Sequence, residues 1–401
     1  MNQNKGAFEG LLVLELASVL AGPSVGQFFG ELGATVIKIE NAATQGDVTR
    51  RWKLETEDKA SDISAYFSAA NWGKKSVALD ITQPAALQAL YKLVAQADVV
   101  IASYKPGDAE KLGVDYTSLQ QLNPRLIYGH ITGYGPDDSR AGYDAVVQAE
   151  SGFMYLNGES ESEPTKMPVA LVDVLAAHQL KEGLLTALYL RERTGKGHYI
   201  TVSLMQAAVS ALVNQATNYL VAGHNPQRMG SSHPNIVPYG SVFTSRDNKQ
   251  LVLAVGDDRQ FRRLCQILGA PELADDPAFA TNAARVQNRQ RINQQLKQLI
   301  AQQDREELLQ QLHLQHVPAG AINTIEEVFA LPQAQGMLLH REQVKPGVKQ
   351  VAFHLSTDQQ ESIQGFDAPP YYGQHTAEVL QQLAGFSESQ VQALRQIEGK
   401  V

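Results

Sequence analysis

The chain has 401 residues, of which 43% are hydrophobic and 19% charged, and its formal net charge at pH 7 is −8. An acidic chain lacks the basic face of nucleic-acid-binding and membrane-surface proteins, so we expect neither nucleic acid nor a membrane among its partners. Residues 1–6 lack the apolar core of a signal peptide, and no apolar run approaches the roughly 20 residues of a membrane span. The composition therefore predicts a cytoplasmic enzyme.

Short apolar segments alternate with helical stretches over the first 200 residues. This alternation predicts an α/β fold with a Rossmann-like parallel sheet, covered by helices on both faces. The expected strands are 11–17, 34–40, 75–79, 98–102, 125–130 and 198–202, and the expected helices are 24–32, 85–97, 174–193 and 204–222. In open sheets of this kind, ligands bind at the loops that follow the strands.

The composition changes at residues 223–238, a loop rich in Gly, Asn, Ser and Pro. A strand over 251–255 and a set of helices from 259 to about 312 should follow it. We interpret residues 1–222 as a large α/β domain and residues 223–324 as a small α+β domain, with 325–401 returning to the large one. In this tail we expect a strand over 350–354 and helices over 376–384 and 387–397.

The first strand–loop–helix unit invites comparison with a dinucleotide-binding site. Its glycines, Gly22, Gly26 and Gly30, do not follow the G-x-G-x-x-G spacing, and Pro23 removes an amide that the phosphate turn would use. Glu40 ends the second expected strand, where a ribose-binding acid would lie, but this feature stands alone. We therefore do not expect NAD(P) to bind.

Cationic side chains gather beside the expected loops of the first domain. They are Arg50, Arg51, Lys74, Lys75, Lys105 and Lys111. Any one of them would be ordinary solvated surface, but together, in an acidic protein, they favour an anionic ligand that carries several phosphates. Trp52, Trp72 and Tyr104 lie beside them and could stack on a base. This combination fits coenzyme A without being specific for it.

The most isolated carboxylate of the chain is Asp173. It lies where an apolar run meets an expected helix, and no other charged residue occurs from Val169 to Gln179. One interpretation is a helix N-cap, which would contribute about 1 kcal/mol. The other is a nucleophile, because a carboxylate with an ordinary pKa of about 3.9 is ionised at neutral pH and needs no histidine partner. We predict that Asp173 accepts an acyl group.

Other kinds of catalytic centre have no support in the sequence. No G-x-S-x-G, P-loop or HExxH motif occurs, and the ten histidines lack metal-ligand spacing. The single cysteine, Cys265, excludes an internal disulfide and is expected in the core of a helix. We therefore expect no metal site and no permanently bound cofactor.

A series of short motifs runs from position 14 to position 239. They occupy positions 14–23, 32–40, 46–50, 71–76, 104–113, 123–127, 133–135, 144–152, 173, 191–197 and 233–239. In this order they resemble the class III coenzyme A transferases, which include formyl-CoA and carnitine-type CoA transferases. The resemblance implies an interlocked homodimer whose large domain binds CoA as a thioester substrate.

The resemblance also implies roles for individual residues. Asp173 matches the catalytic aspartate. Positions of the CoA site are matched by Ser18, Val19, Leu20, Ala21, Lys75, Ser103, Tyr104 and Lys111, and positions of the substrate pocket by Trp52, Tyr143, Asp144, Ser232 and His233. The chain departs from formyl-CoA transferase at Leu20, where that enzyme has glutamine, and at Asn41, where it has arginine. Residues 231–233 also replace a glycine run.

The implied function is a CoA transfer between an acyl-CoA and a small carboxylic acid, through an aspartyl anhydride and an aspartyl-CoA thioester. Arg140, Arg228 and His233 could pair with a second carboxylate, which favours a dicarboxylate such as succinate. One alternative is a 2-methylacyl-CoA racemase, but the histidine of the racemase motif Gly-His-Asp is replaced by Tyr143, a poor base with a pKa of about 10. The other is a non-catalytic CoA-binding scaffold.

Overall fold

The computed structural model describes residues 6–354 and 366–398. The chain forms two compact units, the first made of Met1–Phe153, Met167–Thr217 and Gly336–Val401, and the second of Met154–Lys166 and Asn218–Gln335. We keep the domains inferred from sequence, residues 1–222 with 325–401 and residues 223–324, as a proposal about which part of the chain binds CoA. In the described chain, no helix combines the length and apolar character that a membrane crossing needs.

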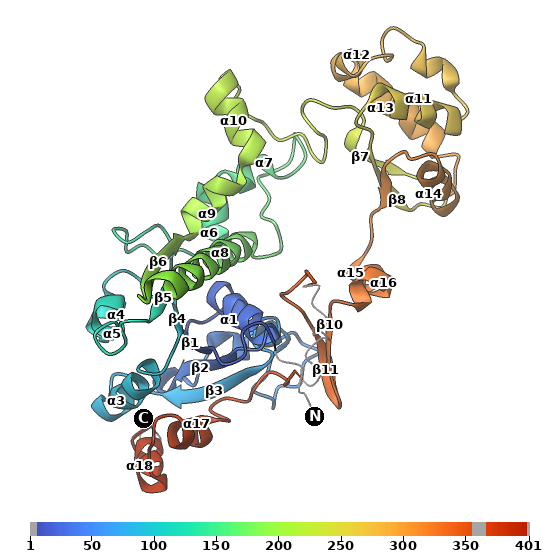
Figure 1. Ribbon diagram of the computed structural model, residues 1–401. Helices are drawn as coiled ribbons and strands as arrows, with labels where there is room; N and C mark the ends of the chain where they lie inside the picture. Colours follow the sequence, from blue (N-terminus) through green and yellow to red (C-terminus); the bar gives the residue numbers. More distant parts are fainter. Residues whose placement is uncertain (1–5, 355–365, 399–401) are drawn as a thin grey trace. The chain divides into compact units, whose positions relative to one another are not determined.

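A parallel sheet forms the centre of the first unit (Figure 1). Its strands are β1 (Leu12–Leu16), β2 (Thr35–Asn41), β3 (Lys74–Leu79), β4 (Val99–Ala102), β5 (Ile127–Thr132) and β6 (His198–Ser203). They pair in the order β3-β2-β1-β4-β5-β6, so the order reverses between β1 and β4. Such a switch point opens a crevice at the carboxyl ends of the strands. The α/β fold and all six strands expected from the sequence are confirmed.

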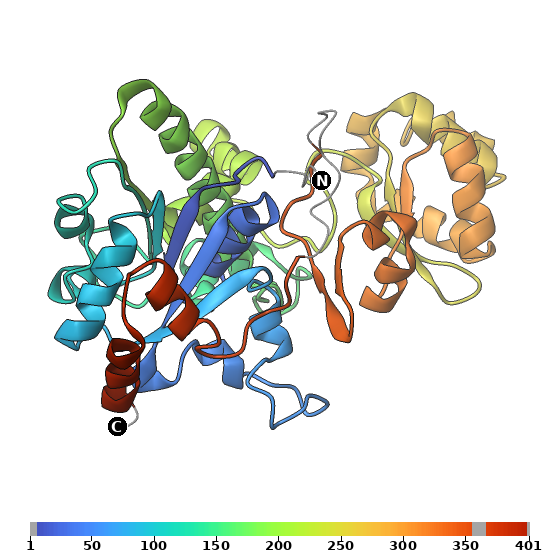
Figure 2. The ribbon, with the colours of Figure 1, turned by 60° about the horizontal axis from the view of Figure 1, so that its bottom comes forward.

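Helices bury both faces of this sheet. Neighbouring residues of β1 point to opposite sides: Val13 belongs to the hydrophobic cluster that includes α1 (Ala21–Glu31), α8 (Leu171–Thr194) and α9 (Leu204–Ala211), and Leu14 belongs to the cluster that includes α3, α17 and α18. Figure 2 shows the last two helices, in red, beside α3. The bounds of this second layer are Pro84–Val94 for α3, Thr376–Gln382 for α17 and Glu388–Glu398 for α18.

Shorter helices complete the loops of the chain. They are η1 (Ala42–Thr44), η2 (Val48–Arg51), α2 (Ala65–Ser68), α4 (Asp108–Lys111), α5 (Tyr116–Leu119), α6 (Asp144–Glu150), α7 (Phe153–Leu156) and α10 (Val213–Ala222). The single helix expected over 204–222 is wrong, because Val213 adopts a φ of 44° and separates α9 from α10.

The strand expected over 350–354 is also wrong. The amides of Gln350 and Val351 donate to the Glu31 carboxylate, at 2.7 and 2.8 Å, instead of to a neighbouring strand. The strands of this region lie just before it and form an antiparallel hairpin, β10 (Leu338–Arg341) and β11 (Val344–Val348).

The second unit holds an antiparallel sheet of β7 (Tyr239–Thr244), β8 (Gln250–Ala254) and β9 (Ala319–Ala321). Its helices are α11 (Asp258–Ile267), η3 (Pro271–Ala274), α12 (Asn282–Gln287), α13 (Arg289–Ile300), α14 (Arg305–Leu314), α15 (Ile325–Ala330) and α16 (Pro332–Gln335). Cys265 is fully buried in α11, as expected.

Buried charges tie β1, β2 and β3 together near the carboxyl end of β1, where the side chains of Lys38 from β2 and Lys74 from the start of β3 meet Glu15. One Glu15 oxygen binds Lys38 Nζ at 2.9 Å and the other binds Lys74 Nζ at 2.7 Å. Lys38 also pairs with Asp47 at 2.9 Å. At most 3% of the surface of any of these four residues is exposed. We call these four residues the buried ion network.

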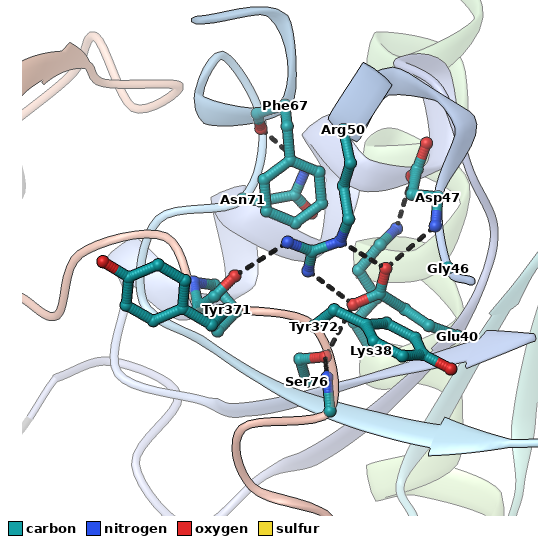
Figure 3. Close-up of polar contacts among 12 residues, drawn as sticks. Lys38, Glu40, Gly46, Asp47, Arg50, Phe67, Asn71, Ser76, Tyr371 and Tyr372 are labelled. Carbon is teal, nitrogen blue, oxygen red and sulfur yellow. Dashed lines mark hydrogen bonds and ion pairs between the residues drawn. The ribbon is translucent and has the colours of Figure 1, made fainter. Parts of the chain in front are cut away.

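A second buried pair adjoins this network (Figure 3). Arg50 grips the Glu40 carboxylate through Nε and Nη2, at 2.8 and 2.6 Å, and Ser76 Oγ donates to the same carboxylate. Burial opposes ionisation of Glu40, but Arg50 and Lys38 outweigh it and lower the pKa of this carboxyl. Both carboxylate oxygens of Glu40 therefore already accept hydrogen bonds within the protein, so Glu40 is not available to bind a ribose.

Glu15→Gln should destabilise the first unit, because it leaves Lys38 and Lys74 buried with too little negative charge. Removing one partner of a buried pair costs about 3–5 kcal/mol in free energy of unfolding, as measured by urea denaturation. As a control, Asp304→Ala removes the exposed pair with Arg246 and should cost less than about 1 kcal/mol. Equal losses in the two variants would show that the network has no special weight.

Candidate active site

Asp173 is the third residue of helix α8, which begins at Leu171. The cap residue is Ala170, whose own side chain makes no capping hydrogen bond. The interpretation of Asp173 as an N-cap is therefore wrong, and capping does not explain why a carboxylate occurs at this position.

The pKa of Asp173 is far from ordinary. Burial, and after it the charge of Asp144, raise this pKa from 3.8 to about 7. The helix dipole favours a carboxylate in the first turn of a helix, but here it is outweighed. The sequence-based assumption of a fully ionised aspartate is thus wrong: near neutral pH, the carboxylate and the carboxylic acid are both populated.

Helix α6 holds the chain just before Asp173. The Asp144 carboxylate accepts the Val172 amide at 2.9 Å with one oxygen and Gln148 Nε2 at 2.8 Å with the other. Gln148 is fully buried, and its side-chain oxygen accepts the Met167 amide at 2.9 Å. Asp144 therefore satisfies one of the free amides at the start of α8 from another helix, one residue before Asp173.

Tyr66 lies close to Asp173 and Asp144, although nothing in the sequence singled it out. It lies on α2, a single turn capped by the Ser64 hydroxyl. Burial and the charges of Asp173, Asp144 and Asp47 raise the pKa of Tyr66, so its hydroxyl keeps its proton and can donate. Trp52 packs edge-on against it, with 5.1 Å between ring centroids. An aromatic residue in a short loop helix has no periodic pattern that would have revealed it.

A cavity of about 460 Å³ opens at the carboxyl ends of β1 to β4, at the switch point of the sheet. We call it the switch-point cavity. Of the residues assigned to the CoA site from the sequence, Ser18, Ser103 and Tyr104 line it. The cavity is also lined by residues that were not assigned to the CoA site from the sequence, among them Arg51, Leu79, Thr82 and Leu112.

The remaining assigned positions lie elsewhere in the first unit. Val19, Leu20 and Ala21 lead into α1, and the Val19 amide donates to both oxygens of Asp47, at 3.3 and 3.2 Å. Lys75 pairs with Glu378, and Lys111 pairs with Asp108 at 3.1 Å.

Trp72 and Lys74, which we expected beside the ligand, are instead buried in the core. Trp72 is 1% exposed and Lys74 is 2% exposed, so neither can contact a ligand in this form of the chain.

The other expected substrate residues have well-defined local contacts. Tyr143 is the cap residue of α6 and is 69% exposed. Ser232 and His233 belong to the second unit, where the His233 amide donates to Tyr239 O at 2.9 Å. Arg140 is paired with Asp138 and Glu150, at 2.9 and 3.2 Å. Among the described residues, no three His, Cys, Asp or Glu side chains are grouped to hold a metal ion.

A family model described as CoA-transferase family III matches residues 8–376. The chain belongs to this family. The family's class of enzyme, recognised above from short motifs, is thereby confirmed, and the protein is a CoA-transferase. Its substrate is accordingly a CoA thioester.

Curated relatives and a solved structure agree with this membership. The succinate–glutarate CoA-transferase of Agrobacterium fabrum is 40% identical, over 96% of this chain and 97% of the relative. The succinyl-CoA:glutarate CoA-transferase of Mus musculus is 34% identical, over 96% and 88%. A crystal structure of a CAIB/BAIF family protein from Brucella suis is 41% identical, with a TM-score of 0.82 over 94% of this chain and all of that one.

Asp173→Asn should stabilise the fold in neutral and alkaline solution. Because folding raises the pKa of Asp173 from 3.8 to about 7, the free energy of unfolding of the unmodified chain falls as the pH rises between these values. Asparagine keeps the shape and avoids this cost, which is on the order of 4 kcal/mol above pH 7.

Urea unfolding near pH 5 and near pH 8 measures the effect. The stability gap between Asp173→Asn and the unmodified chain should widen at the higher pH. The control Asp138→Asn alters an exposed carboxyl whose pKa is lowered by Arg140, and its gap should not widen in this direction. A constant gap for Asp173→Asn would contradict the raised pKa.

Proposed function

We propose that this enzyme transfers CoA from succinyl-CoA, or from a similar dicarboxylic acyl-CoA, to a small dicarboxylate acceptor, with Asp173 as the covalent carrier. The relatives named for succinate and glutarate support the substrate class. The observation that carries the carrier role is Asp173 itself, a partly buried carboxyl whose pKa is raised, close to Asp144 and Tyr66. No observation favours the racemase or the scaffold.

The proposed reaction proceeds through exchange of acyl groups on Asp173. Its carboxylate attacks the thioester carbonyl, the C–S bond breaks, and a mixed anhydride and CoA thiolate form. The thiolate then attacks the aspartyl carbon and releases the donor acid, which leaves an aspartyl-CoA thioester. The acceptor carboxylate then attacks the aspartyl thioester, which releases CoA thiolate and forms a second mixed anhydride. Finally, the thiolate attacks the acceptor carbonyl of this anhydride, so that acceptor-CoA forms and the Asp173 carboxylate is released. Atoms, charges and protons balance without any co-reactant.

The surrounding residues suit this chemistry. Only the ionised form of Asp173 attacks, and a carboxylate with a raised pKa is a stronger nucleophile than an ordinary one. Tyr66 keeps its proton and could donate to an oxyanion. The Gly135 amide already donates to Thr132 Oγ1 at 3.0 Å and is therefore not free to bind an oxyanion. Trp52 and Tyr66 offer an apolar wall that helps to keep water from the anhydride.

The CoA nucleotide is proposed to occupy the switch-point cavity. Its place at the carboxyl ends of the strands is where α/β sheets bind nucleotides, and Tyr104 offers a ring beside it.

The homodimer expected from the sequence is kept as a proposal. It is supported by three large apolar side chains of α8 that are well exposed in the single chain, Leu185, Tyr189 and Leu190.

Asp173→Ala and Asp173→Asn should abolish transfer, because no other residue is proposed to carry the acyl group. With succinyl-CoA and glutarate, we expect loss of more than about 10³-fold in kcat for both variants. Intact mass should show a CoA adduct on the unmodified enzyme and on the control Asp275→Asn, an exposed carboxylate, and none on the Asp173 variants. A variant that retains transfer, or an adduct on another residue, would rule out the proposed carrier.

Asp144→Asn should move the pH dependence of the first half-reaction to lower pH. In the unmodified enzyme, release of CoA thiol in a single turnover should rise with pH around a midpoint near the pKa of Asp173, about 7. Asparagine can still accept the Val172 amide but removes the repelling charge, so the pKa of Asp173 falls. The midpoint stays above 3.8, because burial is the larger cause. An unshifted midpoint would contradict the coupling of the two carboxyls.

A further inference from the structure

The charges that line the switch-point cavity differ in how fully they are paired. Lys38, Glu40 and Asp47 lie on its wall, but all three are engaged in the buried contacts described above. Asp80 is held by Thr82. Arg51 is exposed and lines the same cavity, and its Nη1 donates a hydrogen bond to Thr44 O at 3.1 Å. A guanidinium has five N–H donors, so most of them remain for a ligand.

Arg51 is held in place by its neighbours. It is the last residue of η2, whose first turn is capped by the Asp47 carboxylate accepting the Thr49 amide at 3.0 Å. The preceding residue, Arg50, turns inward to Glu40 and lies over the Phe67 ring, 3.8 Å from its centroid. The backbone that carries Arg51 is therefore anchored on its inner side, as Figure 3 shows for Arg50. A fixed backbone lowers the entropy cost of binding.

The other candidate cations of this region are less suited to a ligand in the cavity. Arg50 and Lys74 are buried in ion pairs, and Lys75 and Lys111 have carboxylate partners in Glu378 and Asp108. Lys105 is exposed but is not among the residues that line the cavity. Asn41 lines it without a charge. Arg51 is thus the cation on this cavity that has no carboxylate partner among the described residues.

We propose that Arg51 is the residue that binds a phosphate of CoA in the switch-point cavity. The planar guanidinium can donate two parallel hydrogen bonds to one phosphate, which lysine cannot do. This inference rests on the proposed function in so far as CoA is the occupant. It assigns phosphate recognition to a residue that does not touch the reacting atoms, so it concerns affinity for CoA and not the chemical step.

The test measures binding of free CoA, dephospho-CoA and pantetheine by calorimetry, together with transfer from the succinyl thioesters of CoA and pantetheine. Arg51→Ala should weaken CoA binding and raise KM for succinyl-CoA by roughly 10- to 100-fold, the usual value of a charge-assisted hydrogen bond. Its kcat should stay within about twofold, because the reacting groups are untouched. Pantetheine, which has no phosphate, should bind the variant and the unmodified enzyme equally. Arg51→Lys should recover part of the loss.

Lys59→Ala is the matched control. Lys59 is an exposed cation of the same loop region that does not line the cavity, and its ammonium donates to Leu54 O. Its removal should leave CoA affinity unchanged, and thermal unfolding should confirm that both variants fold. Dephospho-CoA, which lacks only the 3′-phosphate, shows which phosphate Arg51 binds. If Arg51 binds the 3′-phosphate, Arg51→Ala and the unmodified enzyme should bind dephospho-CoA equally. If Arg51 binds the diphosphate, the variant should bind it more weakly.

An unchanged CoA affinity in Arg51→Ala, or an equal loss of pantetheine binding, would overturn the proposal. An equal loss of CoA affinity in Lys59→Ala would show that the effect comes from the net charge of the region and would overturn the proposal as well. Binding of free CoA is measured without any transfer. Arg51-dependent binding by an enzyme that transfers nothing would therefore refute the proposed function and leave this inference intact.

Discussion

The buried ion network is the constraint on which the rest of the first unit depends. Glu15 binds two lysines, Lys38 in β2 and Lys74 at the start of β3, so it joins β1 to both strands. Burial of such charges is costly, and their attraction offsets this cost only when every group is fully bonded. Here the lysines also donate to backbone carbonyls, Lys38 to Ala17 and Lys74 to Pro23, on either side of the turn between β1 and α1. The network therefore fixes that turn.

The turn itself is strained, and the network accounts for its persistence. Val19 has a φ of 72°, which is unfavourable for a β-branched residue. Its amide donates to Asp47, which is held in turn by Lys38. Lys38 and Asp47 also line the switch-point cavity. One set of charges thus holds the sheet, the strained turn and the wall of the proposed CoA site. Because its side chains are buried and paired, we expect them to move little when a ligand binds.

The sequence predicted the sheet because parallel strands buried on both faces are nearly continuous apolar runs. It did not predict the hairpin β10–β11, whose segment 344–348 contains a lysine, a proline and a glycine. For the proposed active site it predicted Asp173 from its isolation, but the raised pKa of Asp173 depends on burial and on Asp144, which is distant in sequence. It also could not distinguish Arg50 from Arg51. Adjacent residues of a short 3₁₀ helix face different surroundings, and only the position of Glu40 decides which one is buried.

The electrostatics of Asp173 bear directly on the energetics of the proposed covalent carrier. The free carboxylate is destabilised by burial and by Asp144, and its raised pKa measures that cost. Conversion to a thioester or an anhydride removes the charge, so the enzyme is relieved of this cost when it becomes acylated. The donor carboxylate, which is released when the aspartyl thioester forms, is solvated by water and has no such penalty. Each unit of pKa is worth about 1.4 kcal/mol, so the raised pKa favours the aspartyl thioester over the free enzyme. The Asp144 carboxylate, which accepts the Val172 amide at the start of α8, thus also makes the proposed nucleophile beside it a better acyl acceptor.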